Sequence, residues 1–181
     1  GKDVGLLAGR DIINQRTSQT VTHSVMTPAG AGLFGFDPVT QTTSSTQLGL
    51  SADITAGNNL ILKAGRDVSI MGANVNSSGD AVLSAGRDIN VAVLTSTNSS
   101  STSRYAASRS EITQLSSALT TAGNLQMQAG KDLTLTAAQL DVGKDASLNA
   151  GGNLTLAAAK NSRALSFDTG MMQKNNYDET V

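Results

Sequence analysis

The sequence predicts an all-β protein, a right-handed parallel β-helix with three short strands and about 21 residues in each coil. Two observations carry this prediction. A unit of a small residue, a glycine, one or two polar residues and an apolar-x-apolar stretch recurs along the chain, as in residues 64–70 and 129–135. The glycines come in pairs seven or eight residues apart, and the pairs repeat after about 21 residues. A fixed period of this length is typical of solenoids, so we expect one period to form one coil.

The strands are predicted from two-residue alternation of aliphatic side chains. Leu60 and Leu62, or Val68 and Ile70, fall on one face of an extended chain because successive side chains point to opposite faces. A helical solenoid would instead need a 3.6-residue period over ten or more residues. The predicted interior is Leu60, Leu62, Val68, Ile70, Val75, Leu83, Ile89, Val91, Leu125, Met127, Leu133, Leu135, Leu140, Leu148, Leu154 and Leu156.

The corners between strands are predicted at the repeated glycines. A glycine supplies either a positive φ or room for a close backbone approach, and the Asp or Asn that follows can bond the backbone of the bend. The predicted structural corners are Gly9, Gly57, Gly65, Gly79, Gly86, Gly123, Gly130, Gly143 and Gly151.

The pattern organises the chain, residues 1–181, as a single β-helix segment of a longer rod. Coils are expected at about 1–14, 52–92 and 118–158. Three Ser/Thr-rich excursions, at about 15–51, 93–117 and 159–181, lack the glycine unit and leave the helix after every second coil. Alternation at the start of the first excursion predicts a β-hairpin. Its apolar residues Leu33, Phe34 and Phe36 form a candidate contact tip, although packing of this tip onto the helix is an equal alternative.

Stacking is required on energetic grounds. One coil offers about six inward aliphatic side chains at roughly 1.5 to 3 kcal/mol each. Ordering some 21 residues costs on the order of 30 kcal/mol. Neighbouring coils must therefore complete the hydrogen bonds and bury a shared interior, as in other repeat proteins.

Composition excludes several function classes. The net charge is −1 and only 15% of the residues are charged, so we expect no nucleic-acid partner. The chain has no cysteine and one histidine, His23, which removes thiolate chemistry and His-cluster metal sites. No apolar run is long enough to span a membrane. We expect neither a cofactor nor a metal.

An enzyme is the main alternative, because parallel β-helices also host polysaccharide lyases and hydrolases. Such enzymes use paired carboxylates beside a groove, and Asp53, Asp67 and Asp88 could form such a row. Nearly all carboxylates here sit at the repeated corners, where bend geometry accounts for them. We therefore predict a protein without catalytic residues, and an aromatic-lined cleft holding two carboxylates about 5 to 9 Å apart would favour the enzyme.

The repeated Ala-Gly-Arg-Asp-Ile/Val and Ala-Gly-Asn-Leu-x-Leu units, interrupted by Ser/Thr-rich stretches, resemble the haemagglutinin repeats of filamentous haemagglutinin-like exoproteins. Bacteria export these very large proteins by two-partner secretion, and the Ser-rich variety resembles the repeats of contact-dependent growth inhibition effectors. The resemblance implies a stalk on the bacterial cell surface, outside the outer membrane, that serves adhesion or delivery of a linked toxin. The partners it implies are an outer-membrane transporter during export, a target-cell surface or glycan, and stacked neighbouring repeats of the same chain.

Overall fold

The computed structural model describes the backbone of residues 2–28, 38–103, 106–168 and 174–180. It contains β-strands and no α-helix in these residues, and they form two compact units. The β-helix unit comprises Gly1–Thr17, Gly49–Leu94 and Leu115–Ala159, and the hairpin unit comprises Ser18–Leu48, Thr95–Gln114 and Lys160–Val181. The candidate contact tip, Leu33, Phe34 and Phe36, lies outside the described residues.

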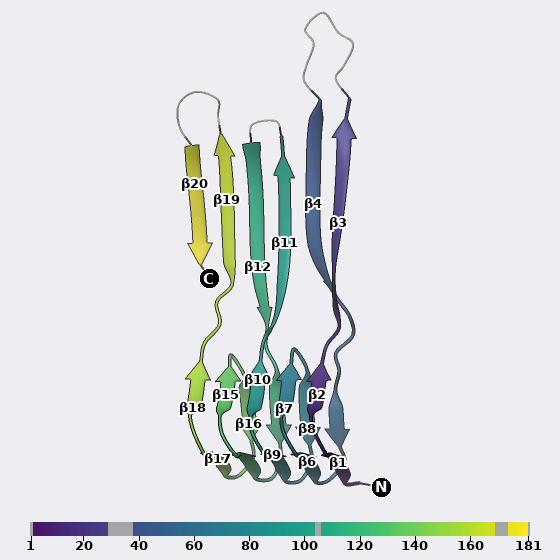
Figure 1. Ribbon diagram of the computed structural model, residues 1–181, viewed down its shortest axis with the longest axis vertical. Helices are drawn as coiled ribbons and strands as arrows, with labels where there is room; N and C mark the ends of the chain where they lie inside the picture. The colour runs from purple at the N-terminus through teal and green to yellow at the C-terminus, as the bar shows by residue number, and fades with distance from the viewer. Residues whose placement is uncertain (1, 29–37, 104–105, 169–173, 181) are drawn as a thin grey trace, which may run out of the picture. The chain divides into compact units, whose positions relative to one another are not determined.

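The β-helix unit consists of three parallel sheets whose strands stack coil upon coil (Figure 1). The first sheet contains β1 (Val4–Ala8), β6 (Leu60–Ala64), β9 (Ala81–Ala85), β14 (Leu125–Ala129) and β17 (Ala146–Ala150). The second sheet contains β2 (Ile12–Gln15), β7 (Val68–Met71), β10 (Ile89–Ala92), β15 (Leu133–Thr136) and β18 (Leu154–Ala157). The third sheet contains β5 (Ile54–Ala56), β8 (Asn74–Ser77), β13 (Ala118–Thr121) and β16 (Gln139–Val142). The predicted parallel β-helix with three short strands per coil is confirmed.

The interior of this unit is an aliphatic core with stacked equivalent side chains. In β6 the residues alternate strictly between buried and exposed, and Leu62 lies in register with Leu83 of the next coil. Twelve of the predicted interior residues are buried, and the core also includes residues outside the predicted interior set. These additional positions are Ala56, Ala64, Ala73, Ala81, Ala85, Leu119 and Ala129.

The prediction of Leu154 and Leu156 as interior residues is wrong. They are 48% and 66% exposed, because β18 pairs with β15 alone among the described strands, and no described strand covers the sheet edge on its other side. Leu140 and Leu148, in the same last coil, are half-buried. Alternation thus predicts the direction of a side chain, whereas burial also requires a coil on each side.

One bend of the coil alternates between two forms. After β7 and β15 the chain turns directly into β8 and β16, through Gly72 with φ 56° and Ala137 with φ 44°. After β2, β10 and β18, whose ends lie in register with those of β7 and β15, the chain continues into a hairpin. A residue with positive φ at this bend therefore marks the coils in which the chain stays in the β-helix.

The hairpin unit is a single antiparallel sheet of three hairpins (Figure 1). Its strands, in spatial order, are β20 (Lys174–Thr180), β19 (Ser162–Asp168), β12 (Ala107–Leu115), β11 (Leu94–Thr102), β4 (Val39–Leu48) and β3 (Ser18–Thr27). The second strand of each hairpin pairs with the first strand of the next, as β4 does with β11 and β12 with β19. Most of its described side chains are polar and solvent-accessible, since neither face is enclosed by another sheet of the unit.

Candidate functional site

Five of the predicted corner glycines form one column, at the corner between the first and second sheets. A Cβ atom on Gly65 would collide with the carbonyl oxygen of Gly9, and the same holds for Gly86 against Gly65, Gly130 against Gly86 and Gly151 against Gly130. Among the described glycines only Gly72 has a positive φ. These corners therefore need glycine for close stacking of the backbones and not for an unusual φ.

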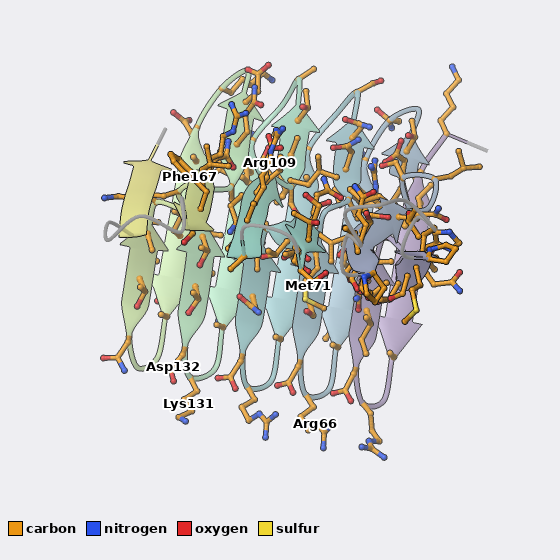
Figure 2. All side chains as sticks on the ribbon, turned by 90° about the horizontal axis from the view of Figure 1, so that it is seen from above. Arg66, Met71, Arg109, Lys131, Asp132 and Phe167 are labelled. Atoms are coloured by element: carbon orange, nitrogen blue, oxygen red, sulfur yellow. The ribbon has the colours of Figure 1, made fainter. Side chains whose placement is uncertain are left out.

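Oppositely charged side chains run along the same corner. The guanidinium of Arg66 donates to both carboxylate oxygens of Asp11, at 2.9 and 2.6 Å. Arg87 binds both oxygens of Asp67 in the same way, one coil further on. The Nζ atom of Lys131 lies 3.5 Å from Oδ2 of Asp132 in its own coil. In Figure 2 the side chains of Arg66 and Lys131 extend from the same edge of the stacked coils. Arg66 and Arg87 thus reach back to the aspartate of the preceding coil.

These contacts lower the pKa of the corner carboxyl groups. The side-chain hydrogen bond from Arg66 lowers the pKa of Asp11, and that from Arg87 lowers the pKa of Asp67. The backbone N–H of Asn153 lowers the pKa of Asp132. A carboxyl group that acts as a general acid needs a raised pKa. Asp11, Asp67 and Asp132 are therefore held as carboxylates that bind the neighbouring coil.

The other corner, between the third and first sheets, carries Gly57, Gly79, Gly123 and Gly143, and its polar column alternates Asp with Asn. The carboxylate of Asp3 accepts the N–H of Asn59 at 3.0 Å, and the amide oxygen of Asn59 accepts the N–H of Asp80 at 3.0 Å. Asp80 in turn accepts the N–H of Asn124 at 2.7 Å. Since carboxylates alternate with neutral amides, this column joins the coils without placing like charges in adjacent positions.

The three aspartates considered for catalysis do not form one row. Asp53 precedes β5 in the third sheet, where its carboxylate accepts from the hydroxyl of Ser51 and the N–H of Asn74. That hydroxyl lowers the pKa of Asp53. Asp67 and Asp88 lie in adjacent coils, at the corner between the first and second sheets. The Nε atom of Arg87 lies 3.1 Å from Oδ2 of Asp88. In the described part of the chain, no three His, Cys, Asp or Glu residues gather in an arrangement that could hold a metal ion.

The hairpin sheet carries two open hollows, of about 190 and 300 Å³. The larger is lined mainly by hydroxyl side chains of β4 and β11, the smaller by residues of β4, β11, β12 and β19, and both include Ser100 and Arg109. Glu111 is the one carboxylate in their lining, and it is paired with Arg109 at 3.0 Å. These two hollows therefore lack the pair of carboxylates and the aromatic lining that a polysaccharide-cleaving site would use.

Two residues of the β-helix unit with a positive φ were not predicted from the sequence. Gly72 and Ala137 adopt positive φ at equivalent places in two coils, but neither belongs to the repeated glycine unit. Their position between the second and third strands of coils without an excursion is the sequence feature that could have indicated a tight bend there. His23 lies exposed on β3, in the hairpin unit.

Stacked parallel coils with glycine corners, an aliphatic interior and side chains that bind the next coil define a β-helical repeat protein. The model of the family described as "Hemagglutinin repeat" matches residues 38–110 and 102–166, more than half of the chain. The chain belongs to this haemagglutinin-repeat family, and the resemblance inferred from the corner motifs is confirmed. No curated protein and no solved structure matches the chain with significance.

Family membership fixes the general character of the protein. Haemagglutinin repeats are structural, generally non-enzymatic modules of filamentous haemagglutinin-like exoproteins, which are secreted and associated with the cell surface. The described residues include no helix with the length and hydropathy needed to cross a membrane.

Proposed function

We propose that this chain is a stalk segment of a large bacterial surface protein exported by two-partner secretion. In this proposal an outer-membrane transporter passes the unfolded chain, and the coils stack on neighbouring repeats outside the outer membrane. The stalk holds either an adhesive region or a toxin domain, as in contact-dependent growth inhibition, at a distance from the producing cell. Target-cell contact, with a surface protein or a glycan, is assigned to the first hairpin.

The corner chemistry is the observation that carries the proposal. Arg66 and Arg87 each bind the carboxylate of the preceding coil, and the Asp/Asn column of the other corner binds across every described interval. Such side chains hold neighbouring coils together, which supports a structural role for the segment. A rigid scaffold with loops added to it commonly carries binding function in the loops.

Deletion of the first hairpin in the full-length protein tests the contact role. The N–H of Gly49 donates to the carbonyl oxygen of Thr17 at 2.8 Å, so removal of residues 18–48 joins two ends that are already adjacent. We expect export to remain intact and target-cell binding or toxin delivery to be lost. Removal of the second hairpin, residues 95–114, is the matched control for a general effect of shortening the sheet.

The two proposed roles fail separately in this experiment. If binding and delivery survive the deletion of residues 18–48, the hairpin has no contact function, although the stalk function stands. If export itself is lost in both deletions while each shortened chain still folds, the hairpins serve secretion instead of contact.

A further inference from the structure

The two hollows of the hairpin sheet lie where short side chains are flanked by longer ones. Thr43 of β4 lies in register with Ser100 of β11, and both have short side chains. On one side of this pair, His23 of β3 is the register partner of Thr43. On the other side, Arg109 of β12 lines both hollows together with Ser100. A trough therefore runs over β4 and β11, and residues of two different hairpins form it.

The trough lies over inner strands of the sheet (Figure 1). β4 pairs with β3 on one side and with β11 on the other, and β11 lies between β4 and β12. A peptide that binds a sheet by strand addition needs an open edge, and neither β4 nor β11 offers one. A ligand in the trough must therefore be recognised by side chains.

The lining of the hollows offers many hydrogen-bonding groups without a net charge. A hydroxyl group can both donate and accept hydrogen bonds, and so can a side-chain amide. Arg109 and Glu111 are the charged residues in the lining of these two hollows, and they carry opposite charges. An anionic ligand would meet Glu111 and a cationic ligand would meet Arg109, so the lining favours an uncharged ligand. The larger hollow is lined by Thr43, Ser44, Ser45, Asn98, Ser99, Ser100, Arg109 and Glu111.

The pair of Arg109 and Glu111 is suited to bind hydroxyl groups. Their side chains are 45% and 41% exposed, and Nη2 of Arg109 donates to Oε2 of Glu111 at 3.0 Å. A guanidinium group has several N–H donors and a carboxylate accepts at both oxygens, so this contact leaves both groups with capacity for a ligand. The pair thus presents donors beside acceptors. Hydroxyl groups on neighbouring carbons of a sugar ring present the complementary set.

We propose that the trough between the first two hairpins binds a neutral saccharide, whose ring hydroxyls contact Arg109, Glu111 and Ser100. The two hollows share Ser100 and Arg109, so adjacent units of one saccharide chain occupy them. Ala107 and Leu165 line the smaller hollow, and Leu165 is 40% exposed, so these side chains meet the C–H groups of a ring. This inference rests on the proposed function, because it names the partner of the contact assigned to the first hairpin.

Saturation-transfer nuclear magnetic resonance on the purified 181-residue chain tests the site. The neutral probes are the methyl glycosides of glucose, galactose, mannose and N-acetylglucosamine, and glucuronate is the acidic probe. We expect transfer to at least one neutral probe and less transfer to glucuronate. Arg109→Met keeps most of the alkyl stem but removes the donors, and should weaken binding roughly tenfold. Arg163→Met is the matched control, because Arg163 is the register partner of Glu111 but lines neither hollow, and it should leave binding unchanged.

A variant that fills the trough provides the second test. Ser100→Leu places a large side chain where the two hollows meet and should abolish the transfer. Ser110→Leu is its control, because Ser110 lies on β12 but lines neither hollow. Circular dichroism shows whether each variant is folded. Transfer to none of the neutral probes, a preference for glucuronate, or equal transfer in the two leucine variants overturns the proposal.

Failure of the saccharide site and failure of the contact role give different results. If no neutral probe binds but deletion of residues 18–48 still abolishes target-cell contact, the saccharide proposal is wrong and the first hairpin contacts a protein. If a neutral probe binds the purified chain but the full-length protein keeps its target-cell contact without residues 18–48, the saccharide site stands and the contact role fails.

Discussion

The β-helix unit and the hairpin unit are both made of strands with alternating sequences, yet they differ in burial. In β6 the aliphatic residues of the alternation are fully buried, whereas in β3 the pattern Thr20, Val21, Thr22, His23 is exposed at every residue. Three sheets enclose the interior of a coil, while the hairpin sheet has no second layer in its own unit. The comparison shows that alternating side chains specify a β-strand. Whether the strand's aliphatic side chains stabilise the fold depends on other sheets enclosing them.

A charged residue in each unit should produce the largest contrast. Leu133→Asp places a carboxylate in the aliphatic core, where Leu133 is fully buried, and should lower the free energy of unfolding by at least about 4 kcal/mol. Thr43→Asp, on an exposed position of β4, should change it by less than about 0.5 kcal/mol. Urea unfolding followed by circular dichroism measures both. Similar losses in the two variants would contradict the difference in burial.

The tight bend of the coil should produce the next largest effect. Gly72 has a φ of 56°, and a Cβ atom there would lie 2.6 Å from Cβ of Leu94. Gly72→Ala should therefore cost about 1 to 3 kcal/mol in unfolding free energy. Gly5→Ala is a suitable control, because a Cβ atom on Gly5 meets only the side chain of Leu7, at 3.8 Å. An equal loss in both variants would show that the bend carries no special constraint.

Acid should weaken the β-helix unit more than the hairpin unit. Asp11 and Asp67 have pKa values lowered below 3.8 in the folded chain, by Arg66 and Arg87. A lowered pKa adds stability above the unfolded value, and this stability is lost as the pH falls through the folded value. Melting temperatures should therefore decline below about pH 4. Asp67→Asn should flatten this decline, and an unchanged pH profile in that variant would contradict the contribution of the pair.

Relief of strain at Ala137 should produce the smallest effect, and in the opposite direction. Ala137 occupies the equivalent bend with φ 44°, a conformation that is unfavourable for alanine. Ala137→Gly removes this strain but increases the entropy of the unfolded chain, so we expect a net gain of about 0.5 kcal/mol. A loss of stability, measured by thermal unfolding, would mean that the alanine side chain contributes more by packing than it costs in strain.

The sequence was sufficient for the fold class because each coil repeats the same local chemistry. Alternating leucines and corner glycines are short-range features, and Leu62, Leu83 and Met127 lie buried as their spacing predicts. Exposure of Leu154 and Leu156 was not predictable from the same features, since it depends on the number of coils that flank a strand. The positive φ of Ala137 escaped detection because alanine carries no conformational signature of its own. The pairing of separate hairpins into one sheet involves strands distant in sequence, which no local period encodes.

Direct measurement of the spacing between coils tests the stacked-coil structure most directly. Ile61 and Val82 are outward-facing register partners in adjacent coils, and Ser147 lies in the same row three strands from Ile61. With spin labels on cysteines at 61 and 82, roughly 5 Å of strand spacing predicts strong dipolar broadening of the electron paramagnetic resonance spectrum. Labels at 61 and 147 should show much weaker broadening. Absence of broadening in the first pair, or equal broadening in both pairs, would contradict the parallel stacking of coils.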